Sequence, residues 1–553
     1  MYLRPRGQPG GAASSRSKTH VLRHLALIAL ALPALWHVIT LTILFWGRMT
    51  YPMDIEWMEG GALYHAHRFT HGLDVYGAPA QGFLPYPYPP IHFVTLGLLG
   101  SVFGLDYGTG RALSIACFTL ACAVTAREVW AASIGARPRA AGLERRPVEY
   151  AAAMALAAVA AVAASFPVVG GWYDLIRNDT MAIALVTLGA GLVSDARPSC
   201  RRILAAAVVL TAAVFTKQSA AFYIPWIGLF LAIRSWQKGA LLAAATGLTA
   251  LAALGVCLWA TEGRFWMWIV TVMSKHPLDR LRFIEGTEIL LGFAPFLLPL
   301  PFAALGLALT RRLSARAVLW LGMLATAIPT SLLTFAKWAA FVNHLIPVLV
   351  FAAPATLIVW ADVVASVRGR PHAAATLRAA GLVAAAGFLA LRRYDPEPHR
   401  ITAEDRRGAA ELNTLVAELR GGVIIPSHPF LAVRNGHRTP QIHDMPYQDA
   451  LYAGVGGVNL PDFLRRTGAR YAILNGTEGP YTQSSVRATY QPERRIDAGV
   501  ATRTGLLTAP HDLLRFRPPP ARVAAEGRDH PGSNCRSGPG GRPAPEERER
   551  SVR

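Results

Sequence analysis

Long apolar runs constrain this chain more than any other feature of its sequence. The first run extends from Leu25 to Trp46, and similar runs recur as far as residue 391. A helix of about 20 apolar residues crosses the hydrocarbon core of a bilayer, and 52% of the 553 residues are hydrophobic. Because a soluble enzyme rarely has so many long apolar runs, the sequence predicts a polytopic α-helical membrane protein.

The chain has a formal net charge of +21, which raises the question of a nucleic-acid partner. Its arginines gather in short loops between the apolar runs and in the two tails, as they do on the cytoplasmic face of membrane proteins. We therefore expect no nucleic-acid partner. The five cysteines show no spacing typical of a disulfide framework.

The positive-inside rule gives the apolar runs an orientation. Basic residues precede the first run, so we expect residues 1–23 to form a cytoplasmic basic tail. The run at 90–104 has only about 15 residues and begins with two prolines, which suits a helix lying on or dipping into the outer interface better than a span. With that choice the arginine-rich loops alternate correctly and about eleven spans follow. These spans lie near residues 25–46, 112–131, 148–165, 180–194, 203–216, 219–233, 239–260, 288–309, 317–334, 345–365 and 376–391.

The hydropathy changes near residue 395. A polar helical pattern covers 403–420, and short strand-like runs occur at 422–426 and 470–475. These patterns predict a small α/β domain at 395–516, outside the membrane.

The rest of the chain is predicted to form a transmembrane domain and a tail. The transmembrane domain covers 24–391 and includes a first outer loop at 47–111. Residues 517–553 are rich in proline, glycine and arginine without periodicity, which predicts a disordered tail. We expect a multi-pass protein of a bacterial inner membrane, with its N-terminus in the cytoplasm and its C-terminal domain in the periplasm or outside the cell.

An acidic motif follows directly after the first span. It reads Met53-Asp-Ile-Glu-Trp-Met-Glu-Gly-Gly61 and contains Asp54, Glu56 and Glu59. An unpaired charge next to the membrane is costly unless it serves a site. A carboxylate there is able to take a proton from an acceptor hydroxyl, because burial and neighbouring charges tune its pKa. A structural alternative stays open, in which these acids cap helices or pair with Arg68.

Other ionisable residues fall on the same outer face in the predicted topology. They are Arg177-Asn-Asp179, Lys217 with Gln218, Lys337, and Asn343 with His344. Cations at a membrane surface can hold a lipid phosphate and stabilise charge as that phosphate leaves. The alternative for the lysines is that they simply extend toward lipid headgroups, and for Arg177 that it pairs with Asp174 or Asp179 as a structural bridge.

Taken in order, these motifs resemble the GT-C superfamily of polyprenyl-phosphate-dependent glycosyltransferases, and in particular its protein O-mannosyltransferase and RgtA-like branch. The resemblance covers roughly residues 20–390. It rests on the acidic motif, the turn Gly72-Leu-Asp-Val-Tyr76, Tyr88-Pro-Pro90 before a short apolar helix ending in Phe103-Gly104, the downstream Arg111, and the ionisable residues of the outer face.

The resemblance implies transfer of a sugar from a polyprenyl-phosphate donor to an acceptor hydroxyl on the outer face, with inversion. The acceptor is a cell-envelope glycan, a lipid or a protein, and membrane lipid surrounds the enzyme. Asp54 would be the catalytic base, with Glu56 and Asp179 as further acidic residues. Donor phosphate and substrate would be bound by Tyr88, Arg111, Arg177, Lys217, Gln218, Lys337, Asn343 and His344. The resemblance implies no specific cofactor. A divalent metal, if one takes part, would bind at Asp54 and Asp179.

The sequence departs from the family pattern at two places. Tyr88 precedes the two prolines where the aminoarabinose transferases of lipid A have a lysine, so phosphate binding has to fall on other residues. The acids of the motif are spaced as Asp54-Ile-Glu56 rather than adjacent, which leaves the role of Glu56 open.

Two other interpretations remain. A lipid or small-molecule transporter or flippase is the main alternative to an enzyme, although its charges typically lie at the midplane of the membrane. In the predicted outer domain, His428, His437, His443 and Asp444 match no compact metal-ligand spacing, and we interpret these histidines as surface residues in loops.

Overall fold

The structure is a computed structural model of the full chain. It describes residues 10–134, 148–367, 369–497 and 502–518, and side chains from residue 24 onward. The predicted tail at 517–553 therefore lies almost wholly outside the described residues. The described residues up to Phe516 belong to one compact unit.

Six described helices are long and apolar enough to cross a membrane. A helix pair bent by 99° counts as a seventh if its two members form one broken span. The six are α1 (Gly10–Met49), α4 (Tyr107–Ile134), α9 (Trp236–Ala260), α13 (Ala315–Phe335), α14 (Ile346–Ser366) and α15 (Pro371–Leu391), and the bent pair is α11 (Arg280–Phe293) with α12 (Leu300–Leu309).

The remaining apolar helices are shorter. They are α3 (Ile91–Phe103), α5 (Val148–Ala164), α6 (Asn178–Val193), α7 (Cys200–Val214) and α8 (Tyr223–Arg234). The count of about eleven spans depends on these helices and stays a prediction. Helix α3 occupies the segment that we expect at the outer interface. It ends at Gly104, whose φ of 87° lies in the region that favours glycine.

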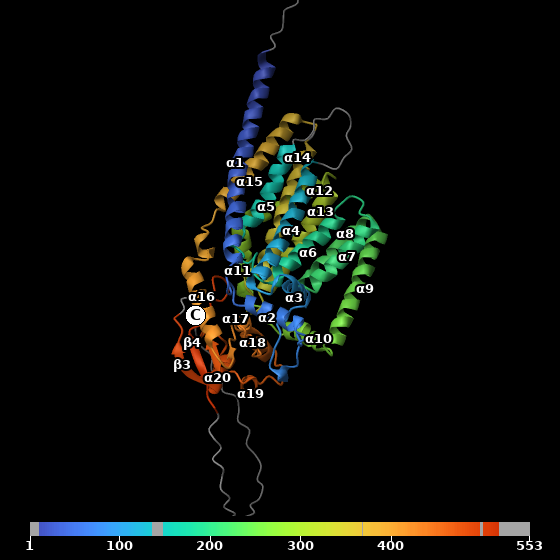
Figure 1. Ribbon diagram of the computed structural model, residues 1–553. Coiled ribbons are helices and arrows are strands. Elements are labelled where there is room, and N and C mark those ends of the chain that lie inside the picture. Colours follow the sequence, from blue (N-terminus) through green and yellow to red (C-terminus); the bar gives the residue numbers. More distant parts are fainter. Residues whose placement is uncertain (1–9, 135–147, 368, 498–501, 519–553) are drawn as a thin grey trace, which may run out of the picture. The chain divides into compact units, whose positions relative to one another are not determined.

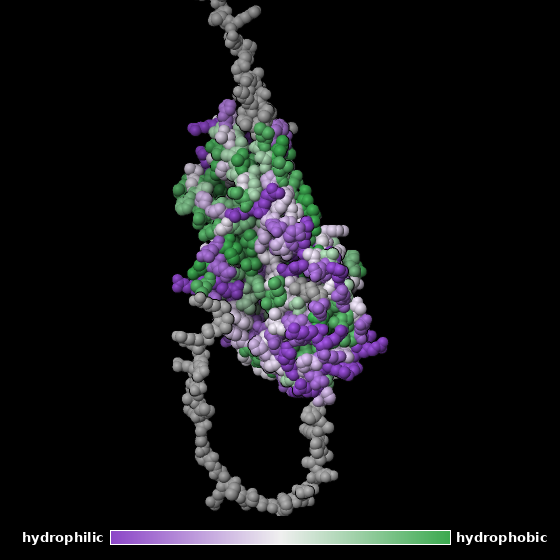
Figure 2. Space-filling model, turned by 90° about the vertical axis from the view of Figure 1, so that its left-hand side faces the viewer, coloured by the Kyte–Doolittle hydropathy of each residue, from purple (hydrophilic) through white to green (hydrophobic). Residues whose placement is uncertain are grey.

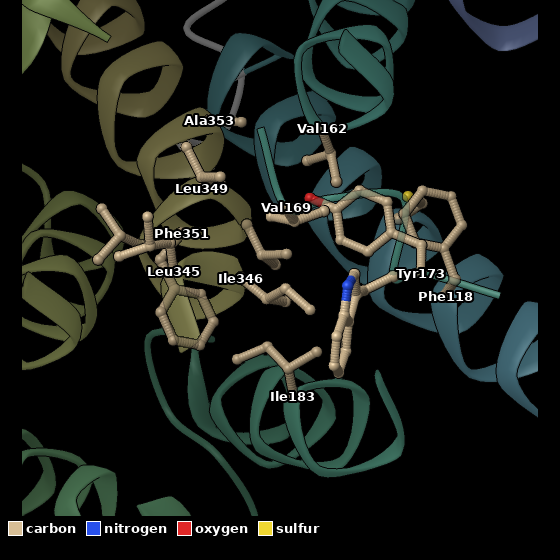
Figure 3. Close-up of a cluster of buried hydrophobic side chains, with 14 of the residues drawn as sticks. Phe118, Val162, Val169, Tyr173, Ile183, Leu345, Ile346, Leu349, Phe351 and Ala353 are labelled. Carbon is tan, nitrogen blue, oxygen red and sulfur yellow. The ribbon is translucent and has the colours of Figure 1, made fainter. Parts of the chain in front are cut away.

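Small residues let the helices approach one another closely. A Cβ added at Gly189 of α6 would lie 2.7 Å from a side-chain carbon of Leu210 in α7. Figure 3 shows Phe118 of α4, Tyr173 of the loop before α6 and Leu349 of α14 in one apolar cluster of the core. This close packing fixes the N-terminal ends of α4, α6 and α14, near which the candidate site lies.

The chain after residue 395 contains a four-stranded mixed sheet with helices around it. The strand order is β1-β2-β4-β3, with β1 parallel to β2 and the other neighbours antiparallel. Strands β1 and β2 fall within the two predicted strand-like runs. The elements are α16 (Ala403–Glu418), β1 (Val423–Ile424), α17 (Pro429–Arg434), α18 (Asp444–Tyr452), α19 (Leu460–Thr467), β2 (Tyr471–Leu474), α20 (Pro480–Thr489), β3 (Tyr490–Arg495) and β4 (Asp512–Phe516).

We call this part, residues 395–516, the outer region, after the side of the membrane that the sequence predicts for it. Its helix α17 packs against α2 (Glu59–Thr70) of the first loop, and both lie at the same end of the helical bundle (Figure 1). On the face shown in Figure 2, hydrophobic residues gather over the bundle and hydrophilic residues over the outer region. The boundary near residue 395 stays a prediction.

Candidate functional site

Asp54 lies in the loop between α1 and α2 and is fully buried. The backbone N–H of Gly60, in the first turn of α2, donates a hydrogen bond to Oδ1. Oδ2 accepts a hydrogen bond from the Tyr107 hydroxyl at 3.1 Å and lies 2.7 Å from Nδ1 of His428. Burial raises the pKa of Asp54, while His428 and the Gly60 N–H oppose that rise. Asp54 therefore holds the start of a helix and contacts the outer region at the same time.

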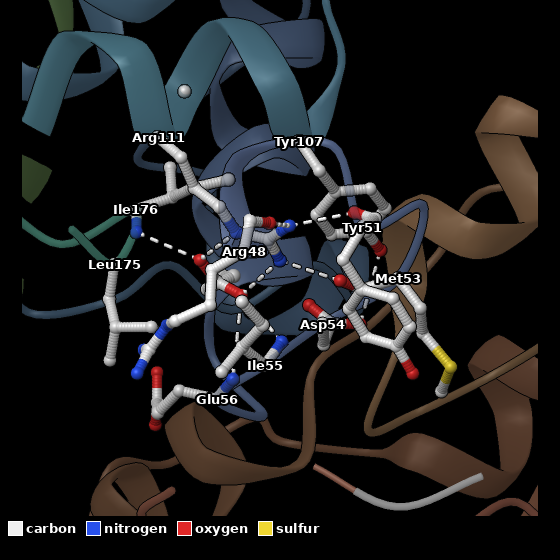
Figure 4. A network of polar contacts seen from close by, with 12 residues as sticks. Arg48, Tyr51, Met53, Asp54, Ile55, Glu56, Tyr107, Arg111, Leu175 and Ile176 are labelled. Atoms are coloured by element: carbon white, nitrogen blue, oxygen red, sulfur yellow. Dashed lines mark hydrogen bonds and ion pairs between the residues drawn. The ribbon is translucent and has the colours of Figure 1, made fainter. Parts of the chain in front are cut away.

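Glu59, the first residue of α2, and Arg111 of α4 form a buried ion pair at the centre of a polar network. Figure 4 shows Arg111 beside Met53 and Tyr107 in this network. Tyr107 and Arg111 lie four residues apart on one face of α4, which directs both side chains toward the loop. All five N–H donors of Arg111 are engaged, two by the Glu59 carboxylate and three by the carbonyl oxygens of Arg48, Tyr51 and Met53. No donor of Arg111 is left for a phosphate, although the family resemblance implied that role.

Glu59 also accepts hydrogen bonds from the backbone N–H groups of Ile55 at 2.6 Å and Ile176 at 3.0 Å. Burial alone would raise its pKa, but Arg111 and these N–H groups hold the pKa of Glu59 below its ordinary value. The structural alternative considered for the acidic residues thus describes Glu59, with Arg111 rather than Arg68 as its partner.

Glu56 connects the acidic motif to a second group of charges. Its Oε2 lies 3.3 Å from an Arg177 nitrogen and accepts a hydrogen bond from the Met58 N–H at 3.2 Å. Its Oε1 is buried and makes no hydrogen bond to the described residues. Burial raises the pKa of Glu56 to about 8, against the opposing charge of Arg177.

Arg177 bridges the two groups. It donates a hydrogen bond to the hydroxyl of Tyr88 at 3.2 Å, and its Nε lies 3.9 Å from Asp179 Oδ2. Tyr88 and Arg177 were both expected in the donor site, and the structure brings them together beside Glu56 and Asp179.

A small cavity of about 30 Å³ opens beside Asp179 at the start of α6. Lys217 forms an ion pair with Asp179 Oδ1, which also accepts a hydrogen bond from the Asn343 amide at 2.8 Å. Asp179, Lys217, Asn343 and His344 all line this cavity. The structure therefore gathers four of the expected site residues, from three segments that are far apart in the sequence, around one space.

The cavity wall also contains residues that sequence reasoning missed. The hydroxyl groups of Tyr223 in α8 and Ser331 in α13 are buried and make no hydrogen bond to the described residues. Both residues line the cavity. They lie within apolar runs, where a lone hydroxyl gives no sequence signal, so only the packing of α8 and α13 reveals them.

Gln218 and Lys337 lie close by but are not among the residues that line the cavity. The Gln218 amide donates to the carbonyl oxygens of Pro87 at 2.8 Å and Ile269 at 3.2 Å. The Lys337 ammonium donates to the carbonyl oxygen of Met273 at 3.2 Å. Both side chains therefore tie loops together in this structure.

The surface interpretation of the outer-region histidines is wrong for two of them. His428 and His443 are buried, and His437 is half-buried. His428 contacts Asp54 across 374 positions of sequence. His443 donates a hydrogen bond to the Trp57 carbonyl oxygen at 3.1 Å, and burial lowers the pKa of His443 to about 3. Sequence spacing gave no sign of these contacts because they depend on how the outer region docks.

The arrangement of Asp54 and Asp179 does not fit a metal site. The oxygens of Asp54 face N–H and O–H donors, and Asp179 faces the Lys217 ammonium and the Asn343 amide. Within the described residues, no group of three or more His, Cys, Asp or Glu side chains is arranged to hold a metal ion. We derive no step that uses a metal.

Of the comparisons with known proteins, only the comparison of structures finds similar chains. The sequence matches no protein-family model and no curated protein sequence. The structure is similar to that of ArnT from Cupriavidus metallidurans bound to undecaprenyl phosphate, with a TM-score of 0.52 at 12% identity over 87% of this chain and 97% of that chain. The apo state of the same protein gives a TM-score of 0.52 at 13% identity, over 88% and 97% of the two chains.

An oligosaccharyltransferase from Archaeoglobus fulgidus shows a weaker likeness, with a TM-score of 0.39 at 11% identity over 80% of this chain and 67% of that chain. The likeness to ArnT shows that the two chains share a fold. Membership of the GT-C superfamily stays a prediction. Placement in the RgtA-like branch stays a prediction.

Proposed function

We propose that this chain is a membrane glycosyltransferase that moves a sugar from a polyprenyl-phosphate donor to an acceptor hydroxyl on the outer face. The observation that carries the proposal is the cavity at which Asp179, Lys217, Asn343 and His344 converge. Arg177 links this cavity to the acidic motif, because it lies 3.9 Å from Asp179 and 3.3 Å from Glu56. The ArnT structure, which has this fold, binds undecaprenyl phosphate, and this supports a lipid phosphate as the ligand.

In the proposed reaction, the acceptor oxygen attacks the anomeric carbon while the bond from that carbon to the phosphate oxygen breaks. Lys217 and Arg177 stabilise the negative charge of the departing lipid phosphate. The proton of the acceptor hydroxyl passes to Asp54, which later releases it to water. One displacement inverts the anomeric configuration. Tyr88, Gln218 and Lys337 then act as supporting residues of the donor site, and Arg111 holds the acidic motif in shape.

The geometry favours Oδ1 as the oxygen of Asp54 that receives the proton. Oδ2 contacts both Tyr107 and His428, whereas Oδ1 accepts a single hydrogen bond from the described residues, from Gly60. Because Asp54 is fully buried, binding of the acceptor has to displace residues that cover it.

The test is reconstitution of the purified protein in vesicles with a labelled polyprenyl-phosphate sugar. We expect release of free lipid phosphate only when an acceptor is supplied. Asp54→Asn should lower the rate by at least about 100-fold while leaving membrane insertion normal. The control is Asp106→Asn, because Asp106 lies in the connection between α3 and α4, has a side chain that is 46% exposed and pairs with Arg434 of the outer region. Movement of the labelled lipid between leaflets without release of lipid phosphate would instead indicate a transporter.

A further inference from the structure

Three buried side chains form a row from the acidic motif into the outer region. Asp54 Oδ2 lies 2.7 Å from Nδ1 of His428, and Nε2 of the same ring lies 3.1 Å from the hydroxyl oxygen of Thr508. The side chains of Asp54 and His428 are 0% and 1% exposed, and Thr508 is buried as well. Such a row in water-free surroundings allows few alternative side-chain orientations.

The backbone of the outer region holds His428 in place. His428 lies directly before α17, where its own N–H donates to the Ile425 carbonyl oxygen at 3.0 Å. The next-but-one residue, Phe430, packs edge-on against Tyr107 with ring centroids 5.6 Å apart. Tyr107 of α4 is the second donor to Asp54 Oδ2, so α17 packs against one donor and follows directly after the other.

A second segment of the outer region also holds the acidic motif. The backbone N–H groups of Arg503 and Thr504 lie 2.8 Å and 3.2 Å from the carbonyl oxygen of Ile55, and Thr504 forms a β-bridge with Glu56. Thr508 follows a few residues later on the same segment. The outer region therefore contacts the acidic motif through its backbone as well as through His428.

The contact with Asp54 requires a proton on Nδ1 of His428, because an oxygen of an ionised carboxylate only accepts hydrogen bonds. On the other side of the ring, the Thr508 hydroxyl lies 3.1 Å from His428 Nε2 and 3.4 Å from the Thr502 hydroxyl. The Thr502 hydroxyl donates to the Leu506 carbonyl oxygen at 2.8 Å, and its oxygen accepts the Thr508 N–H at 2.8 Å. These contacts hold Thr508 beside the imidazole.

We propose that His428 is a positioning residue, which holds Asp54 Oδ2 and so leaves Oδ1 as the oxygen that meets the acceptor. The outer region in this way completes the catalytic half of the site. This inference rests on the proposed function. An imidazole that serves only to tie the two regions together would make the same contacts, so the test has to separate catalysis from docking.

The experiment compares three substitutions at one position in the reconstituted full chain. His428→Asn places an amide N–H near the position of Nδ1 and keeps the donor to Asp54. His428→Gln places its amide near Nε2 and loses that donor, and His428→Phe loses both groups while keeping the ring. The matched control is His437→Phe, because His437 is a half-buried histidine that contacts the Val416 carbonyl oxygen, away from the acidic motif.

We expect His428→Asn to stay within about threefold of the wild-type kcat, and His428→Gln and His428→Phe to lose about 10- to 100-fold, the effect of one hydrogen bond to a charged group. The KM for the lipid donor should stay unchanged in all variants, because the donor cavity lies at Asp179. The thermal unfolding midpoint of each variant is measured in parallel, and His437→Phe should match the wild type in turnover.

Equal kcat values for the Asn and Gln variants would overturn the positioning role, even if the Phe variant fails to fold. A turnover above that of the wild type in any His428 variant would show that the residue covers Asp54 rather than positions it, and would also overturn the proposal. Absence of transfer by the wild type is a different result, since it would refute the proposed function itself.

Discussion

The acidic motif, residues 53–61, and the cavity at Asp179 both bury charged groups at one end of the helical bundle. The two sites differ in how many of their buried polar atoms have hydrogen-bond partners. In the loop, Arg111 has each of its N–H donors engaged, and both oxygens of Glu59 accept hydrogen bonds. At the cavity, Asp179 Oδ2 and the hydroxyl groups of Tyr223 and Ser331 are buried without a hydrogen-bond partner among the described residues.

The difference separates groups that stabilise the fold from groups that wait for a ligand. A buried polar group without a partner costs free energy, and native proteins keep few such groups. Several of them around one space, next to Lys217, are what a site for a polar ligand requires. Charge alone therefore does not identify a functional residue, because Arg111 and Lys217 carry the same charge and differ in their free donors.

The largest effect is expected from a substitution of Arg111. It tests whether the charged groups of the acidic motif stabilise the fold. Arg111→Met should prevent accumulation of folded protein, because loss of one member of a buried ion pair costs about 3–5 kcal/mol. The remaining Glu59 carboxylate and three carbonyl oxygens would stay buried without their donor. The measurement is the yield of monodisperse protein after extraction from the membrane, with the thermal unfolding midpoint of what remains.

Arg127→Met is the matched control, because Arg127 lies in the same helix and pairs with Glu128 but has a side chain that is 46% exposed. It should cost no more than about 1 kcal/mol. If Arg111→Met instead folds normally and raises only the KM for the lipid donor, Arg111 binds phosphate and the comparison drawn above is broken.

The second prediction concerns Lys217, which we place among the groups that bind a ligand. Lys217→Met should still fold, because Arg177 and Asn343 remain in contact with Asp179. It should raise the KM for the lipid donor by about tenfold, because one cation that we propose to contact the phosphate is lost. The KM for the acceptor should change little. Steady-state kinetics with each substrate varied in turn, on reconstituted protein, separates the two constants.

Lys238→Met serves as the control, since Lys238 is a partly buried lysine of α9 that does not line the cavity. Loss of folded protein in Lys217→Met, with no change in donor KM for the protein that remains, would show that the pair with Asp179 is structural. The charged groups at the cavity would then stabilise the fold, as those of the acidic motif do.

Much of the fold could be predicted from the sequence. The apolar runs gave the membrane class, and the paired prolines with Gly104 gave the short helix α3, because helix length and helix-ending residues are local properties. The number of spans is harder to predict, since a short apolar helix such as α5 or α6 crosses or does not cross according to its tilt and its neighbours.

The candidate site could be predicted only in part. Asp179, Lys217 and Asn343 were expected together because the predicted topology places them on one face of the membrane, and the structure brings them to one cavity. His428 and Tyr223 were missed for opposite reasons. His428 reaches Asp54 only through docking of a region far along the chain, and Tyr223 is hidden by the apolar sequence around it. Contacts between distant segments leave no local pattern.

The smallest expected effect concerns Glu56, which lies between the two regions because one of its oxygens has partners and the other has none among the described residues. Its pKa is raised from 4.5 to about 8, so the folded protein binds this proton more tightly than the unfolded chain does. The free energy of unfolding that depends on this proton is fully present below pH 4.5 and is lost as the pH rises through 8. The glutamine of Glu56→Gln has no proton to lose in this range. Between about pH 5 and pH 8, the unfolding midpoint of this variant should therefore fall by about 2 °C less than that of the wild type.

The comparison uses thermal unfolding of both proteins at several pH values, with Glu411→Gln as the control because Glu411 is exposed on α16. The wild type and the control should follow the same curve, and the Glu56→Gln curve should be flatter because no carboxylate is left there to ionise inside the protein. Parallel curves for all three would mean that Arg177 keeps Glu56 ionised across this range. Glu56 would then belong with Glu59 among the saturated acids of the loop, and the boundary between the two regions would lie at Arg177.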